Sequence, residues 1–150
     1  MSDMQTPEAG RWTGGIHLLP VRVYYEDTDF TGVVYYANYL KFLERGRTDA
    51  LRTAGVSHND LWQAEPRLGF AVRKIQVEYL VPARIDDALG VETRFMGARG
   101  ARMTLAQRIL RDGEVLVTAE VEAACIDADG RPRRLPAAVR DAFARLARPL

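Results

Sequence analysis

Two carboxylates precede the longest apolar helical pattern in the chain. Asp27 and Asp29 lie in a turn-like stretch over 27–32, and from Tyr36 onward apolar residues recur at three- and four-residue spacing. The first turn of a helix has unpaired N–H groups and partial positive charge, so it can bind the oxyanion that forms in acyl transfer. A carboxylate beside those groups can attack a carbonyl or deprotonate a water. The spacing therefore suits carboxylate-driven hydrolysis, although the same aspartates could simply cap the helix.

The residue types present disfavour several other kinds of active site. The only serines are Ser2 and Ser57, and neither has the surroundings of a hydrolase nucleophile. With Cys125 as the single cysteine and no pair of histidines, a zinc site of the usual ligands is difficult to build. The sequence also has no glycine-rich phosphate loop. Carboxylate chemistry remains, with a magnesium ion bound by Asp27 and Asp29 as an alternative.

Hydrophobic periodicity places the two aspartates between a strand and the long helix. Alternating apolar residues predict a strand over 17–26, and the helical spacing predicts a helix over 36–54 that ends at Gly55. Ser57 is a suitable cap for a short helical turn. Four further strands and a C-terminal helix are expected at 69–80, 88–95, 103–110, 114–126 and 139–147.

The order of these elements predicts the fold class. Short turns between the later strands imply antiparallel neighbours. The single long helix must bury its apolar stripe, and the sheet is the one large partner available. We therefore expect an α+β domain in which the helix lies against a curled, antiparallel, five-stranded sheet. Residues 1–15 show no period and are expected to form a flexible leader, which leaves 16–150 as a single domain.

The composition is typical of one globular domain. The chain has 150 residues, of which 47% are hydrophobic. Lys and Arg outnumber Asp and Glu by 21 to 20, so the charge gives no support to nucleic-acid binding. One cysteine and the lack of a signal peptide favour a cytoplasmic location. Peripheral association with a membrane is left open.

The residues around Asp29 closely resemble the signature of the 4-hydroxybenzoyl-CoA thioesterase family. The nearest branch is that of the Tol–Pal-associated acyl-CoA thioesterases. Two later segments, 77–87 and 130–136, are also similar to the family, so the resemblance covers about 18–137. The signature consists of Asp-Thr-Asp at 27–29, Gly-Val-Val-Tyr at 32–35, Ala-Asn-Tyr-Leu at 37–40 and Phe-Leu-Glu-Arg at 42–45.

This resemblance implies a hotdog fold, in which the sheet wraps around the long helix, and assembly into homodimers or dimers of dimers (homotetramers). It implies an acyl-CoA substrate, with coenzyme A as part of that substrate and no separate cofactor. Asp29 would be the catalytic carboxylate, and the backbone N–H of Tyr36 would polarise the thioester carbonyl. Many members of the nearest branch carry histidine in place of Tyr36. A backbone donor survives that change, and the tyrosine side chain could either pack in the core or use its hydroxyl.

Three more residues are candidates for substrate binding. The family often has an acid at the position of Glu44, where it can face the acyl group; alternatively, Glu44 pairs with Arg45 or Arg47, or across a dimer. Arg99 and Arg102 match a basic turn that contacts the nucleotide in similar proteins, and arginine binds phosphate in a forked geometry.

Two other functions remain open. One is a hotdog dehydratase or isomerase, which would need a histidine near the carboxylate; only His58 could approach Asp29 in space. The other is a binding module that holds acyl-CoA or a protein partner without turnover.

Overall fold

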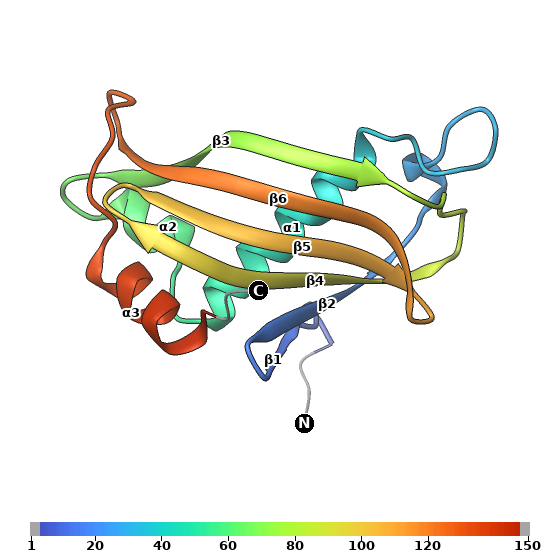
Figure 1. The fold of residues 1–150 in the computed structure, drawn as a ribbon, viewed down its shortest axis with the longest axis horizontal. Coiled ribbons are helices and arrows are strands. Elements are labelled where there is room, and N and C mark those ends of the chain that lie inside the picture. Colours follow the sequence, from blue (N-terminus) through green and yellow to red (C-terminus); the bar gives the residue numbers. More distant parts are fainter. Residues whose placement is uncertain (1–3, 148–150) are drawn as a thin grey trace.

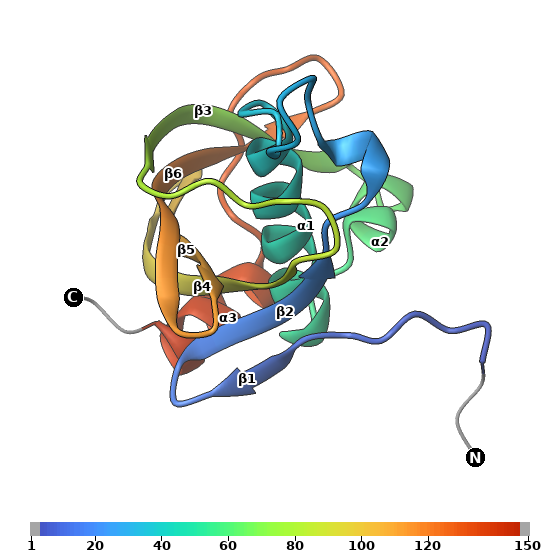
Figure 2. The same ribbon diagram turned by 90° about the vertical axis from the view of Figure 1, so that its right-hand side faces the viewer.

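A computed structural model describes residues 4–147 and contains one antiparallel sheet and three α-helices. The strands lie in the order β1-β2-β4-β5-β6-β3 (Figure 1), and the sheet curls around α1 (Figure 2). The elements are β1 (Arg11–Thr13), β2 (Ile16–Arg22), the 3-10 turn η1 (Tyr25–Asp27), α1 (Asn38–Thr53), α2 (His58–Gln63), β3 (Leu68–Tyr79), β4 (Ala88–Arg99), β5 (Arg102–Arg111), β6 (Glu114–Asp127) and α3 (Ala137–Leu146).

This architecture confirms the expected hotdog fold but corrects the strand count. The sheet has six strands, because Arg11–Thr13 pairs with β2 inside the segment that was expected to be a leader. Gly14 and Gly15 make the tight turn with φ of 59° and 83°, a conformation that favours glycine. Trp12 then packs edge-on against Phe95 in the core, with ring centroids 4.9 Å apart. The prediction of a leader over 1–15 is therefore wrong for residues 11–15.

The first predicted strand is also too long at its C-terminal end. It ends at Arg22, and Tyr25–Asp27 forms a 3-10 turn. The Tyr24 N–H donates to Asp27 Oδ2 at 2.8 Å, which caps that turn. Consequently Tyr25 is 83% exposed rather than continuing the buried alternation of Val23. The other predicted elements are confirmed with small shifts of their ends.

The long helix packs on the concave side of the sheet through Tyr39, Phe42, Leu43, Gly46 and Ala50. It begins at Asn38, two residues later than predicted, and contains 16 residues. It is therefore about 24 Å long. None of the described helices is both long and apolar enough to cross a bilayer.

Gly46 lies where α1 approaches the sheet most closely, and Gly46→Ala is expected to destabilise the fold by about 1–3 kcal/mol. A Cβ there would be 2.6 Å from Val91 Cγ1 and 3.2 Å from Gln107 Nε2. This overlap outweighs the gain of about 1 kcal/mol in helix propensity. The close neighbours are thus side chains of β4 and β5.

Urea unfolding measures the effect of this change. Gly97→Ala is the matched control, because a Cβ at Gly97 would have no atom within 4 Å. The control should stay within about 0.5 kcal/mol of wild type. Equal stability of the two variants would contradict the close approach at Gly46.

Candidate active site

Asp29 lies in a tight loop that joins β2 to α1, at the end of the sheet where α1 begins (Figure 1). Thr28 and Val34 form a bridge across this loop. The Asp29 N–H donates to the Val33 carbonyl at 2.8 Å, and the Gly32 N–H donates to the Asp29 carbonyl at 3.1 Å. Gly32 has a φ of 84°, so the turn needs glycine there. The backbone on both sides of the carboxylate is therefore fixed.

The Asp29 carboxylate is held by one oxygen. Its Oδ1 accepts hydrogen bonds from the Thr31 backbone N–H at 2.8 Å and from the Thr31 hydroxyl at 2.7 Å. Among the described residues no other hydrogen bond of this geometry reaches the carboxylate, although the backbone N–H groups of Val33 and of Asp29 itself also help to lower its pKa. The bonds from Thr31 lower the pKa of Asp29 below its ordinary value, because they stabilise the charged form. Asp29 is therefore an anion at neutral pH, with one oxygen available to react.

The backbone N–H of Tyr36 lies just before the start of α1. The Tyr35 N–H donates to the Asp27 carbonyl at 3.0 Å, and the Asn38 N–H donates to the Tyr35 carbonyl at 2.8 Å. The Asn38 side chain also donates to the Asp27 carbonyl, at 2.9 Å, which ties the loop to the helix. Within residues 4–147 the Tyr36 N–H has no acceptor. Tyr36 precedes the first helical residue, so its N–H extends the row of unpaired donors.

An aromatic surface surrounds this donor. The ring of Tyr36 lies 4.9 Å from that of Tyr35 and 6.1 Å, edge-on, from that of Tyr79. Tyr36 is 60% exposed, so the alternative of core packing for its side chain is wrong. Tyr39 is buried beside Tyr79, and burial raises the pKa of Tyr39. The negative charge of Asp29 adds a smaller contribution to this shift, which indicates that Asp29 and Tyr39 are near each other.

Glu44 is exposed on α1, farther along the helix from Asp29. It forms no ion pair within the described chain, so pairing with Arg45 or Arg47 is not found. Arg47 instead donates to Gln107 Oε1 at 3.1 Å. Burial lowers the pKa of His58, and the charge of Glu44 opposes that shift. Glu44 therefore influences His58 of α2 through its charge and not through an ion pair.

His58 lies on α2, at the opposite end of α1 from Asp29 (Figure 1). The whole of α1, about 24 Å long, lies between the Asp29 loop and α2 along the chain. The His58 ring packs edge-on against Phe70, with centroids 5.5 Å apart. Within one chain, the histidine–carboxylate pair of a dehydratase or isomerase is therefore not assembled from these two residues.

Arg99 and Arg102 also lie far from Asp29. They face each other in the hairpin between β4 and β5, at the opposite end of the sheet (Figure 1). Arg102 lies 3.5 Å from Glu122, which also pairs with Arg73 at 2.7 Å. A single chain therefore does not bring the expected nucleotide-binding arginines to the carboxylate.

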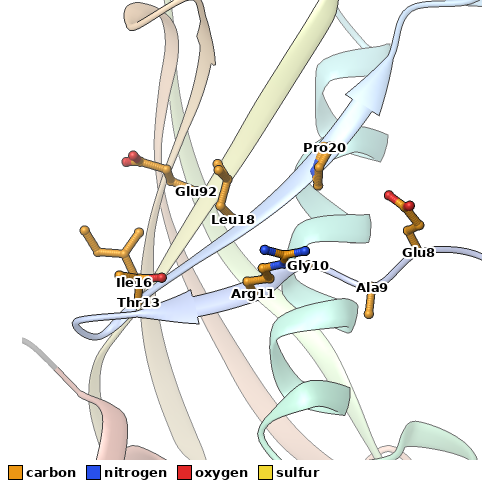
Figure 3. Close-up of a pocket in the computed structure, with 9 residues that line it drawn as sticks. All are labelled: Glu8, Ala9, Gly10, Arg11, Thr13, Ile16, Leu18, Pro20 and Glu92. Carbon is orange, nitrogen blue, oxygen red and sulfur yellow. The ribbon is translucent and has the colours of Figure 1, made fainter.

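A wide groove of about 590 Å³ lies on the outer face of β1 and β2 (Figure 3). Ile16, Leu18 and Pro20 supply its apolar wall, and Glu92 lies beside it. Neither Asp29 nor any other predicted site residue lines this groove. It is separate from the candidate active site.

Comparisons with known proteins identify the family of the chain. The sequence model described as "Thioesterase-like superfamily" matches residues 23–143. The chain belongs to the thioesterase-like superfamily. It is 44% identical over 125 residues to "Acyl-CoA thioesterase YbgC" of Haemophilus influenzae, covering 83% of this chain and 91% of that protein. It is 47% identical over 122 residues to "Acyl-CoA thioester hydrolase YbgC" of Escherichia coli O157:H7, covering 80% and 90%.

Solved structures of this superfamily share the fold. A probable thioesterase from Bartonella henselae has a TM-score of 0.79 at 46% identity, covering 81% of this chain and 99% of that one. A 1,4-dihydroxy-2-naphthoyl-CoA thioesterase from Synechocystis has a TM-score of 0.80 at 22% identity, covering 90% and 100%, which shows the fold alone. The expected enzyme class, a thioester hydrolase, is confirmed. The narrower 4-hydroxybenzoyl-CoA and Tol–Pal assignments stay predictions.

Two residues of the site escaped the sequence analysis, namely Thr31 and Asn38. Both act through local hydrogen bonds, Thr31 on the Asp29 carboxylate and Asn38 on the Asp27 carbonyl. A threonine two positions after an aspartate is a known signal for such a turn. The pattern at 29–31 could therefore have identified Thr31.

Proposed function

We propose that this thioesterase hydrolyses acyl-CoA, with the Asp29 carboxylate as general base or nucleophile and the Tyr36 N–H as oxyanion donor. The observation that supports the proposal is that both side-chain hydrogen bonds of Asp29 end on Oδ1, while the Tyr36 N–H, seven positions later in the same loop, has no acceptor among residues 4–147. The relatives named as acyl-CoA thioesterases support coenzyme A as the leaving group.

Two chemical routes fit this arrangement. In the first, Asp29 takes a proton from water, the resulting hydroxide attacks the carbonyl carbon, and the C–S bond then breaks while the thiolate recovers the proton. In the second, Oδ2 attacks the carbonyl carbon and expels the thiolate, and water then hydrolyses the mixed anhydride. Both develop negative charge on the carbonyl oxygen, which the Tyr36 N–H would stabilise. A single turnover in ¹⁸O water labels Asp29 only in the second route.

Release of free thiol from purified protein tests the proposal. The panel contains short and long aliphatic acyl-CoAs together with benzoyl- and 4-hydroxybenzoyl-CoA, each with and without EDTA. We expect hydrolysis of at least one substrate class that survives EDTA. Bound but intact acyl-CoA across the whole panel would overturn hydrolysis in favour of a binding module. Loss of activity in EDTA would favour the magnesium alternative at Asp27 and Asp29.

We also infer that the protein is a homo-oligomer built through β3. In the described sheet, β3 pairs with β6 on one side only. On its helix-facing side it exposes Val72 (49%) and Tyr79 (45%), and Leu40 of α1 is 38% exposed. A long edge strand with an exposed apolar face is a ready template for pairing with another chain. Two-fold pairing would be antiparallel, which brings the end of one sheet to the opposite end of the other.

That arrangement would give the two arginines a role. The end of one copy that carries Arg99 and Arg102 would lie toward the Asp29 end of the other copy. Phosphates of a coenzyme A bound at one Asp29 would then be recognised by the second chain. We also propose a cytoplasmic location, which suits a chain whose single cysteine, Cys125, is a free thiol.

Val72→Lys is expected to convert the oligomer to monomers, because it places a charge in the proposed apolar interface. Light scattering measures the mass against the chain mass of 16.8 kDa. Leu18→Lys is the matched control, since Leu18 is 44% exposed on the opposite edge of the sheet. The control should remain at least a dimer. A Val72→Lys protein with the wild-type mass would remove β3 as the interface.

A further inference from the structure

We propose that Thr31 is a positioning residue of the hydrolytic site, which holds Oδ1 of Asp29 and thereby selects Oδ2 as the reacting oxygen. This inference rests on the proposed function. It adds a residue outside the signature stretches at 27–29 and 32–35, and it specifies which carboxylate oxygen does the chemistry.

Both hydrogen bonds from Thr31 end on the same oxygen. The backbone N–H reaches Asp29 Oδ1 at 2.8 Å, and the hydroxyl reaches it at 2.7 Å. The N–H bond closes a local turn that any residue could make, whereas the hydroxyl bond requires Thr or Ser. Together they fix the plane of the carboxylate, because any intermediate rotation would break both bonds, and a half-turn only exchanges two equivalent oxygens. Oδ2 therefore keeps a constant direction.

The loop supports this orientation from both sides. Asp29 donates its own N–H to the Val33 carbonyl and accepts from the Gly32 N–H. Since the backbone is fixed, the hydroxyl of Thr31 acts on the side-chain torsions of Asp29. A reacting group held in one geometry gains rate through orientation, and displacement by about 1 Å can cost about 10²-fold.

The same hydroxyl has an electrostatic effect. Hydrogen bonds to a carboxylate favour its charged form, and those from Thr31 are the main cause of the lowered pKa of Asp29. The other charged or titratable groups around the loop are Asp27 before it, Tyr39 of α1 and Arg84, whose backbone bridges Val33. None of these is altered by a change at Thr31. A difference between Thr31 variants therefore reports the hydroxyl itself.

The first experiment follows the ¹³Cγ resonance of Asp29 as a function of pH in the free protein. Thr31→Val should raise the midpoint of the titration, because the charged form loses its strongest donor. Thr31→Ser should restore the wild-type midpoint. Thr28→Val is the matched control, since the Thr28 hydroxyl donates to the Tyr25 carbonyl in the same loop and not to Asp29. Equal midpoints in wild type and Thr31→Val, or an equal shift in the control, would overturn the proposal.

The second experiment measures thiol release with the same variants. Thr31→Val should lower kcat by about 10- to 100-fold at the pH plateau, with a smaller change in KM. It should also move the acid limb of the pH profile upward, and Thr31→Ser should recover both properties. A loss of rate in Thr31→Val that Ser does not rescue would indicate a merely structural role. A wild-type protein that releases no thiol defeats the proposed function, whatever the titration shows. An active wild type with an unshifted titration defeats only the role of Thr31.

Discussion

Asp29→Asn should lower kcat for acyl-CoA hydrolysis by about 10²–10⁴-fold while the fold is retained. An amide can neither accept the proton of the attacking water nor attack the thioester as an anion. Its carbonyl oxygen can still accept both hydrogen bonds from Thr31, so the loop keeps its shape. Thiol release at saturating substrate measures the effect, and thermal unfolding checks the fold.

Asp27→Asn is the matched control for that result. Asp27 lies in the same loop, but its Oδ2 accepts the Tyr24 N–H and so serves the turn. An asparagine there keeps an acceptor oxygen, and we expect a far smaller loss of kcat than at Asp29. Near-normal turnover in Asp29→Asn, or an equal loss in both variants, would exclude Asp29 as the base or nucleophile.

The lowered pKa of Asp29 also sets the direction of the pH dependence. The carboxylate is active as an anion and stays ionised below the ordinary titration range of an aspartate. Activity that depends on it should therefore persist into mildly acidic solution and decline only as pH falls through the lowered pKa.

Asp49→Ala should lower the free energy of unfolding by about 2–5 kcal/mol, because it leaves the buried His17 ring and the partly buried Gly10 N–H without their acceptor. Asp49 Oδ2 accepts the Gly10 N–H at 2.7 Å and lies 2.8 Å from His17 Nε2. Asp49 is 6% exposed and His17 is fully buried. Burial lowers the pKa of His17, although Asp49 opposes the shift, so the contact is a hydrogen bond from a neutral ring at pH 7.

Urea unfolding compares Asp49→Ala with two other variants of α1, Asp49→Asn and Arg52→Ala. Asp49→Asn retains an acceptor oxygen and should lose clearly less stability than Asp49→Ala. Arg52→Ala removes an arginine that is 64% exposed at 3.6 Å from Asp49, and such surface pairs contribute less than about 1 kcal/mol. If Asp49→Ala unfolded at the same urea concentration as Arg52→Ala, the buried contact between Asp49 and His17 would make no net contribution to the free energy of unfolding.

The sequence predicted those parts of the molecule that depend on nearby residues. The helix and the later strands follow from short spacings, and all of these elements are found. The hairpin at Gly14 and Gly15 was missed because its polar surroundings concealed a turn signal that was present. The helix, the strands and this hairpin can each be predicted from residues that are close together in the sequence.

Long-range placement could not be predicted in the same way. His17 meets Asp49 across 32 positions, and nothing in either residue's neighbourhood indicates the contact. Arg99 and Arg102 were expected near the substrate, but strand patterns do not say which end of a sheet a hairpin occupies. Within one chain the hairpin lies opposite Asp29, and only a second chain could bring it closer.

The catalytic groups proposed here all come from one short stretch, 27–38, that closes on itself through its own backbone. The candidates for contacting the acyl group and the nucleotide, Glu44 of α1 and the arginines of the β4–β5 hairpin, lie outside this stretch. Reactivity and selectivity are thus encoded in separate segments. Substrate preference can therefore change through substitutions outside the loop that leave its hydrolytic groups in place.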